Sequence, residues 1–124
     1  MKTEVFTWTD FDSAIKVLTE KVVSCGRVFT NIYGIPRGGL VVAVALSHSL
    51  GLPVLTNRKC VTLGTLVVDD ISDTGKALLP FALGGHAIAT LHVVPTTRVQ
   101  PTFFVQVRKL DWIKYPWENR KEEL

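Results

Sequence analysis

The sequence has 124 residues, of which 47% are hydrophobic and 20% are charged, and its formal net charge is +3. This length and composition predict one globular domain over residues 1–124 and exclude a disordered chain. The mildly basic charge suits an anionic small ligand, and because Lys and Arg are scattered along the chain we expect no nucleic acid partner.

Nothing in the sequence predicts export or insertion into a membrane. The N-terminal residues lack a leading apolar run, which argues against a signal peptide. The apolar run Leu40 to Leu50 is too short for a bilayer, which needs about 20 residues. Cys25 and Cys60 lack the spacing of metal ligands. We expect inert, reduced thiols, and the alternative is one disulfide between them. We therefore expect a cytoplasmic protein with no membrane partner.

The first expected element is a helix over Thr9 to Val23. Thr9 is the expected N-cap, with Asp12 at the position of a capping-box acid, and Gly26 is the expected end. Apolar residues recur on one face at helical spacing, at Phe11, Ile15, Leu18 and Val22.

Strands and helices then alternate along the chain. The expected strands cover Val28–Ile35, Leu52–Thr56, Thr65–Val68, Ala87–Val94 and Thr102–Val107, and the expected helices cover Leu40–Leu50 and Gly75–Ala82. Pro53 indicates that the second strand starts late or lies at an edge of the sheet. This alternation predicts an α/β fold with a mostly parallel sheet and right-handed crossovers.

Two adjacent carboxylates, Asp69 and Asp70, follow the buried strand and precede the turn Asp73-Thr74-Gly75. Ligands of open α/β sheets bind at the carboxyl ends of strands. The turn can direct backbone N–H groups at an anion, and a following helix dipole would favour negative charge there. The paired carboxylates suit ligand hydroxyls or Mg²⁺. The alternative is a solvated acidic turn that only caps the helix.

A second candidate anion site, Arg37-Gly38-Gly39, also lies between a strand and a helix. Paired glycines allow close backbone approach, and an arginine fork can bind phosphate. The alternative is an ordinary turn with an exposed arginine. Together the two strand ends indicate a ligand that carries phosphates at two places.

The third feature is the aromatic segment 112–118, which contains Trp112, Tyr115 and Trp117. One interpretation is a flat platform for a base, with backbone groups near Ile113 contacting the edge of that base. The other is a segment that folds back to cover the core. The three histidines share no ligand spacing and are expected to be structural.

The run Asp69-Asp70-Ile71-Ser72-Asp73-Thr74-Gly75-Lys76 resembles the motif with which type I phosphoribosyltransferases bind 5-phosphoribosyl-1-pyrophosphate (PRPP). Arg37-Gly38-Gly39 is similar to the pyrophosphate loop of that family. Within it, Asp111-Trp112-Ile113 and Pro116-Trp117-Glu118 resemble the bacterial xanthine-guanine enzymes. The resemblance implies a mainly parallel five-stranded sheet flanked by helices, with a small hood over the site.

The activity implied is transfer of phosphoribose from PRPP to a purine-type base, with Mg²⁺ as cofactor and with pyrophosphate and a nucleotide as products. By the same resemblance, Asp73, Thr74, Gly75, Lys76 and Ala77 would hold the 5′-phosphate. Asp69 and Asp70 would contact the ribose hydroxyls, directly or through Mg²⁺ and its waters.

The remaining implied roles concern the base and the leaving group. Asp73 would exchange a proton with a ring nitrogen, so Asp73 and Asp70 are the candidate catalytic residues. Arg37, Gly38 and Gly39 would contact pyrophosphate. Trp112 would stack on the base, and the backbone of Ile113 would hydrogen-bond its edge. The resemblance also implies a homodimer or a homotetramer.

Three positions differ from the usual pattern of the purine enzymes. The connection Asn57 to Gly64 is short where relatives carry a longer flexible loop that closes over the site. Val94 stands where a lysine usually contacts a base carbonyl, and Ala77 stands where the phosphate loop commonly ends in threonine. Two alternatives therefore stay open: a non-catalytic or regulatory module that binds PRPP or a nucleotide, and a metal-dependent phosphate-binding domain unrelated to PRPP.

Overall fold

Five parallel strands form the centre of the structure, a computed structural model that describes residues 1–118; the last residues of the expected domain, 119–124, lie outside the described residues. The strand order is β3-β2-β4-β5-β6, and each neighbouring pair is parallel. The bounds are β2 Asn31–Gly34, β3 Val54–Leu55, β4 Thr65–Ser72, β5 Ala87–Val93 and β6 Phe103–Val107. The predicted α/β fold with a five-stranded parallel sheet is confirmed.

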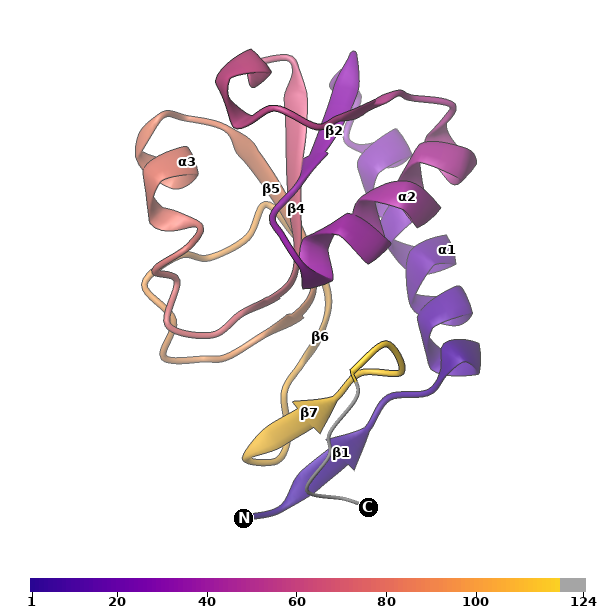
Figure 1. The fold of residues 1–124 in the computed structure, drawn as a ribbon, viewed down its shortest axis with the longest axis vertical. Helices are drawn as coiled ribbons and strands as arrows, with labels where there is room; N and C mark the ends of the chain where they lie inside the picture. The colour runs from indigo at the N-terminus through magenta and orange to yellow at the C-terminus, as the bar shows by residue number, and fades with distance from the viewer. Residues whose placement is uncertain (119–124) are drawn as a thin grey trace.

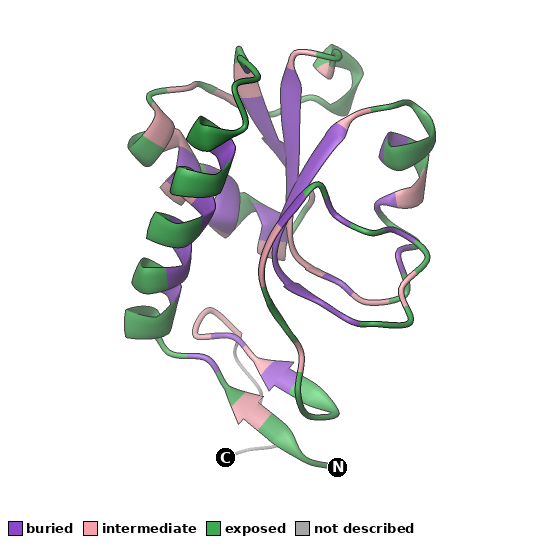
Figure 2. Cartoon of the chain, turned by 180° about the vertical axis from the view of Figure 1, so that it is seen from behind, coloured by how far each residue is buried: buried purple, intermediate pink, exposed green. Residues whose placement is uncertain are grey.

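Helices cover both faces of this sheet (Figure 1). Helices α1 (Trp8–Ser24) and α2 (Gly38–Leu50) pack with Leu66 and Val68 of β4 on one face. Val67 points to the other face and packs with Phe81 of α3 (Leu79–Leu83). In Figure 2, β5 is buried along its whole length and β4 is buried except at residues 69–71, as expected for a parallel sheet covered on both sides. No helix within residues 1–118 has the length and apolar character to cross a bilayer.

The predicted N-cap of the first helix is wrong by two residues. Thr7, not Thr9, caps α1: its Oγ1 accepts from the Asp10 N–H at 3.1 Å, and its own N–H donates to Asp10 Oδ2 at 2.9 Å. The sequence contains two such Thr-x-x-Asp patterns, and the earlier one allows Trp8 to pack on Phe11 within the helix. The predicted apolar face of this helix is buried as expected.

The next helix and strand lie close to their predicted positions. Helix α2 begins at Gly38, two residues before the predicted start, and ends at Gly51, whose φ of 69° is left-handed. Strand β3 is a short edge strand that starts after Pro53, as that proline predicted.

The helix predicted over Gly75–Ala82 begins later, at Leu79. Gly75 has a φ of +86°, which the helix does not allow, and the N–H of Leu79 donates to the Gly75 carbonyl at 2.9 Å to form an isolated turn. Pro80, which lacks an N–H, lies in the first turn of α3. The turn after β4 therefore does not lead directly into a helix, and the predicted contribution of a helix dipole there is wrong.

A two-stranded parallel sheet, absent from the sequence prediction, joins the two ends of the described chain. Strand β1 (Thr3–Val5) pairs with β7 (Trp112–Lys114), and the N–H of Trp112 donates to the Lys2 carbonyl at 3.1 Å. Figure 1 shows this small sheet beyond the carboxyl ends of the central strands. It occupies the place of the expected hood and carries the first half of the aromatic segment.

Candidate functional site

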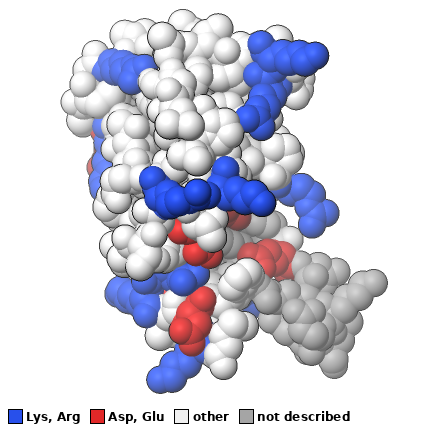
Figure 3. Space-filling model, turned by 90° about the vertical axis from the view of Figure 1, so that its left-hand side faces the viewer, with Lys and Arg blue, Asp and Glu red and all other residues white. Residues whose placement is uncertain are grey.

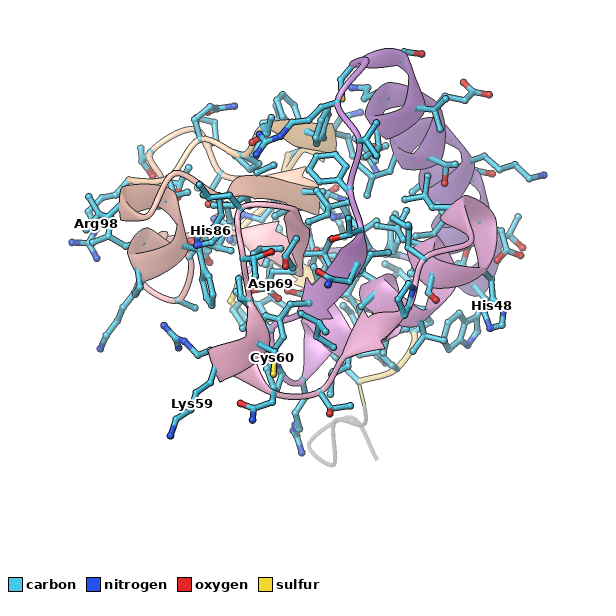
Figure 4. All side chains as sticks on the ribbon, turned by 90° about the horizontal axis from the view of Figure 1, so that it is seen from above. His48, Lys59, Cys60, Asp69, His86 and Arg98 are labelled. Carbon is cyan, nitrogen blue, oxygen red and sulfur yellow. The ribbon has the colours of Figure 1, made fainter. Side chains whose placement is uncertain are left out.

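The two adjacent carboxylates lie within β4 and point to opposite sides of the strand. Asp69 lines one pocket and Asp70 lines another, and both side chains are half-buried. The Asp70 N–H donates to Asp69 Oδ1 at 2.8 Å. Seen along the sheet in Figure 4, Asp69 lies in the middle of the molecule, whereas His48 and His86 lie toward its outside.

Burial raises the pKa of both carboxyls, and the negative charge of Asp70 raises that of Asp69 further. Two carboxylates confined in this way gain from a cation or from hydroxyl donors. Among residues 1–118 no group of three or more His, Cys, Asp or Glu side chains is arranged to hold a metal ion. A cation bound at this pair would therefore take further oxygen ligands from a substrate or from water, as Mg²⁺ commonly does.

The first pocket has a volume of about 140 Å³ and is lined by Asp69 and by the turn from Ser72 to Leu78. Gly75 is packed so closely that a Cβ would lie 2.9 Å from the Val99 backbone nitrogen. Ser72 Oγ donates to the Val99 carbonyl at 2.7 Å and thereby holds the turn against the next loop. The predicted phosphate-loop side chains of Thr74, Lys76 and Ala77 are exposed around this pocket.

The second pocket also has a volume of about 140 Å³ and lies against the two-stranded sheet. It is lined by Asp70, Ile71, Asp73, Arg108, Trp112, Ile113, Tyr115 and Glu118. Asp73 and Ile71 line both pockets, so the two meet at these residues. Trp112 is 38% exposed and contributes a flat ring to the wall, while Ile113 is buried beside it.

Arg108 was not among the residues predicted from the sequence. Its Nη1 lies 3.2 Å from Asp73 Oδ2, and its side chain is 19% exposed. The N–H of Arg108 donates to the Val93 carbonyl at 3.0 Å, which anchors it at the end of β5. The signal available in the sequence was a cation directly after the last strand, because parallel strands end at the same edge of the sheet.

The loop Arg37-Gly38-Gly39 lies directly against the acid pair. A Cβ on Gly38 would collide with the Asp70 carboxylate, and one on Gly39 would lie 2.6 Å from the Val68 carbonyl oxygen. Only glycine allows this approach of the loop to β4. Arg37 is exposed and forms the N-cap position of α2, and the Pro36–Arg37 peptide bond is cis. Arg37 lines neither of the two pockets described above.

The aromatic segment divides into two parts with different surroundings. Trp117 stacks on Tyr115 at 4.8 Å and packs on Phe11 and Trp8, so this part covers the core. Trp112, by contrast, faces the second pocket. The interpretation that the segment covers the core is confirmed for Trp117. The base platform stays a prediction, and Trp112 is the residue placed to form it.

Tyr115 also connects the small sheet to the acid pair through a buried hydrogen-bond chain. Its O–H donates to the Asp70 carbonyl at 3.3 Å, and its oxygen lies 2.8 Å from His92 Nδ1. The other ring nitrogen of His92 is 3.2 Å from Gln106 Nε2. Burial lowers the pKa of His92 to about 4, so the imidazole is neutral and donates to Tyr115. His92 is a structural residue, as predicted.

The short connection from Asn57 to Gly64 packs on the body of the protein. It contains a 3₁₀ turn, Arg58–Cys60, and the guanidinium of Arg58 lies 4.5 Å from the centre of the Phe81 ring. Lys59 points outward in Figure 4, and Cys60 is a free, exposed thiol. This connection lines neither pocket.

Charged side chains of both signs meet on the face that carries α3 and the two pockets. Figure 3 shows acidic side chains gathered in the lower half of this face, with basic side chains above and below them. Such a surface suits an anionic ligand whose charge is neutralised in part by a bound cation.

The known proteins that this chain resembles are phosphoribosyltransferases. No family model matches the chain. A purine phosphoribosyltransferase from Pyrococcus horikoshii Ot3 has a TM-score of 0.79 and 34% identity, with 97% of this chain and 96% of that chain covered. The Helicobacter pylori xanthine-guanine-hypoxanthine phosphoribosyltransferase has a TM-score of 0.78 at 20% identity, with 94% of each chain covered, and thus shares the fold.

A relative identified by sequence is the xanthine-guanine phosphoribosyltransferase of Nitratidesulfovibrio vulgaris. It is 26% identical over 141 residues, and the alignment covers 91% of this chain and 83% of that protein. The aligned length exceeds the 124 residues of this chain, so the relative contains insertions that this chain lacks. That finding agrees with the short connections seen here.

Proposed function

Since the chain belongs to the purine phosphoribosyltransferases of the type I family, we propose that it transfers 5-phosphoribose from PRPP to a purine-type base and releases pyrophosphate. The observation that carries this proposal is the pair of pockets that meet at Asp73, with the acid pair between them. One pocket has the backbone of an anion-binding turn, and the other has an aromatic wall. A ligand with a phosphate at one end and a flat ring at the other would span both.

The phosphate end of PRPP would occupy the turn from Asp73 to Ala77. The backbone there is held by Gly75 and by the Ser72 hydrogen bond to Val99, so its N–H groups are arranged before the ligand arrives. Lys76 supplies a cation at the exposed rim. Ala77 lacks a hydroxyl, so the backbone supplies the donors at that position.

The acid pair would bind the ribose hydroxyls and, with them, Mg²⁺. The residues fit this ion because burial raises the pKa of both carboxyls, the charge of Asp70 raises that of Asp69 further, and a divalent cation offsets both effects. When bound, the ion would stabilise the negative charge of departing pyrophosphate. Asp69 and Asp70 would hold it directly or through water, and Asp70 would orient the ribose.

Pyrophosphate would leave toward Arg37, Gly38 and Gly39. The exposed guanidinium of Arg37 can contact phosphate oxygens, and the glycine backbone lies close to the Asp70 carboxylate. The bond from ribose to pyrophosphate breaks and the bond to the base nitrogen forms, while positive charge develops on the ribose. Nearby carboxylates stabilise that charge, so positioning and electrostatics supply most of the catalysis.

The base would lie in the second pocket against Trp112. The backbone of Ile113 in β7 would contact its edge, and Asp73 would accept or return a proton at the ring nitrogen. The expected cytoplasmic location rests on composition, and the expected homodimer or homotetramer rests on the resemblance. Light scattering after size-exclusion chromatography measures the assembly.

The proposal is tested by measuring pyrophosphate release from PRPP with a panel of purines and pyrimidines, with and without Mg²⁺. We expect release with at least one purine, dependence on Mg²⁺, and loss in Asp70→Asn. The exposed helix residue Asp12 provides a matched control, Asp12→Asn, which should keep full activity. Binding of PRPP without release of pyrophosphate in the presence of any base would show a binding module and not an enzyme. Absence of PRPP binding would refute both functions.

A further inference from the structure

Arg108 is the one cationic side chain among the described residues that line the second pocket. It enters from the end of β6, and its backbone is fixed to the Val93 carbonyl at the end of β5. The side chain is largely buried and reaches Asp73, with 3.2 Å between Nη1 and Oδ2. Buried arginine at the wall of a pocket is costly unless its donors are used, and this ion pair uses only one of five N–H groups.

The rest of the pocket wall supplies few competing donors. Asp70, Asp73 and Glu118 are carboxylates, and the hydroxyl of Tyr115 is already committed to the Asp70 carbonyl. The pocket therefore presents a donor and an acceptor side by side, Arg108 and Asp73. A ring that enters the pocket can hydrogen-bond to both side chains when it carries an acceptor, for Arg108, next to an N–H donor, for Asp73.

We propose, on the basis of the function proposed above, that Arg108 determines which purine the enzyme accepts. Its guanidinium donates to a carbonyl oxygen at C6 of the base, and Asp73 accepts from the adjacent N7–H. These two positions lie next to each other on one edge of a 6-oxopurine. Val94, which is buried and apolar, does not line this pocket, so the donor comes from the strand beside it.

A 6-aminopurine does not fit this arrangement. Its amino group would direct N–H donors at the Arg108 guanidinium, which has no acceptor. The facing N–H groups of the base and of Arg108 would then have no hydrogen-bond partners. Sites built to hydrogen-bond a particular group reject analogues that cannot make that bond. Arg108 thus makes this pocket favour 6-oxopurines over adenine.

The experiment compares kcat/KM for guanine, hypoxanthine, xanthine and adenine in the wild type and in Arg108→Met, which keeps the length of the side chain without its donors. We expect kcat/KM for 6-oxopurines to fall by roughly 10- to 100-fold, as for loss of a hydrogen bond from a charged group. The value for adenine should change by less than about threefold, and the KM for PRPP should stay within about twofold. Arg108→Lys, which restores the charge and one donor direction, should recover part of the preference.

Arg27→Gln is the control for removing an arginine that lies outside the two pockets. Arg27 contacts the Phe29 ring and the Leu63 carbonyl, before the amino ends of β2 and β4 and so at the edge of the sheet opposite the pockets. The Arg27→Gln variant should leave kcat/KM unchanged for all four purines. Asp73 is 46% exposed, so water can solvate it when Arg108 is removed, and the fold should persist in Arg108→Met. Circular dichroism checks whether Arg108→Met is folded. If it is not, the kinetics of Arg108→Lys test the inference.

The outcomes separate the inference from the function on which it rests. An unchanged ratio between 6-oxopurines and adenine in both arginine variants would overturn the role of Arg108 while the transferase function stands. A wild type that prefers adenine, or a change confined to the KM for PRPP, would overturn it too. Absence of transfer to every base would refute the proposed function, and the inference would fall with it.

Discussion

Replacing Asp69 by Asn should stabilise the ligand-free protein at neutral pH and abolish phosphoribosyl transfer. The wild-type carboxyl is held close to Asp70 in a half-buried position, and burial and that neighbouring charge raise its pKa from the ordinary 3.8 to about 8. The amide of asparagine keeps an oxygen that accepts from the Asp70 N–H and can donate to the Asp70 carboxylate. The substitution thus removes the ionisable group and keeps the local hydrogen bond.

The sign and size of this effect follow from proton linkage. Above pH 3.8 the unfolded chain loses the Asp69 proton while the folded protein keeps it, so the folded state loses stability as pH rises until the raised pKa is passed. Over the interval from 3.8 to 7 this amounts to at most about 4 kcal/mol, at 1.36 kcal/mol per pKa unit. Because the side chain still contacts water, we expect Asp69→Asn to gain about 1–3 kcal/mol at pH 7.

The assay is reversible denaturant unfolding of both proteins from pH 4 to pH 8.5, read as the difference between their free energies of unfolding. This difference should be near zero at about pH 4, should grow as pH rises, and should level off above the raised pKa. Acids outside this pair cancel in the difference, and Asp12→Asn should show no such rise. A difference that is flat with pH, or an Asp69→Asn protein that is less stable at pH 7, would refute the reasoning.

Three further substitutions test separate contacts. Gly39→Ala would place a Cβ 2.6 Å from the Val68 carbonyl oxygen, so it should lower the free energy of unfolding by about 1–3 kcal/mol and weaken PRPP binding, both measurable by denaturation and calorimetry. Tyr115→Phe leaves the His92 Nδ1–H without its buried partner and should cost about 1–3 kcal/mol in the same unfolding assay. Trp112→Ala should raise the KM for the base about 10-fold or more in steady-state kinetics and leave the KM for PRPP unchanged.

Two of these substitutions, Gly39→Ala and Trp112→Ala, have an informative control. In Gly64→Ala the nearest atom to the new Cβ is the Thr30 side-chain oxygen at 3.0 Å, so this substitution should lower the free energy of unfolding less than Gly39→Ala does. Trp8→Ala removes a ring of similar size that does not line the pocket, so it should affect stability and not the KM for the base. An equal cost at Gly64 and Gly39, or a change in the KM for PRPP in Trp112→Ala, would contradict the assigned contacts.

Local patterns in the sequence were sufficient for the parts of the site that follow buried strands. Asp69 and Asp70 come after an apolar run that begins a central strand, although β4 extends past both of them to Ser72, and Gly38 and Gly39 follow another strand. Because parallel strands end at one edge, the two loops had to meet, and Gly38 in fact lies against Asp70. The apolar face of α1 was predictable for the same reason, since its spacing depends on the helix alone.

The remaining features depend on tertiary contacts that no local pattern contains. Strands β1 and β7 have three residues each and exist only because each pairs with the other across the whole chain. The start of α3 depends on how Gly75 packs against Val99. Arg108 gains its place from the Val93 carbonyl and from Asp73. The sequence showed a cation after a predicted strand, but not which carboxylate it reaches.

The most direct test of phosphoribosyl transfer is a single-turnover experiment with the protein in excess over PRPP, with Mg²⁺ and guanine present. It detects the chemical step even if the short connection from Asn57 to Gly64 makes repeated turnover slow. The account predicts one equivalent each of pyrophosphate and of the purine nucleoside monophosphate, and neither product with Asp70→Asn. Bound PRPP that stays intact after prolonged incubation with guanine, hypoxanthine and xanthine would contradict it.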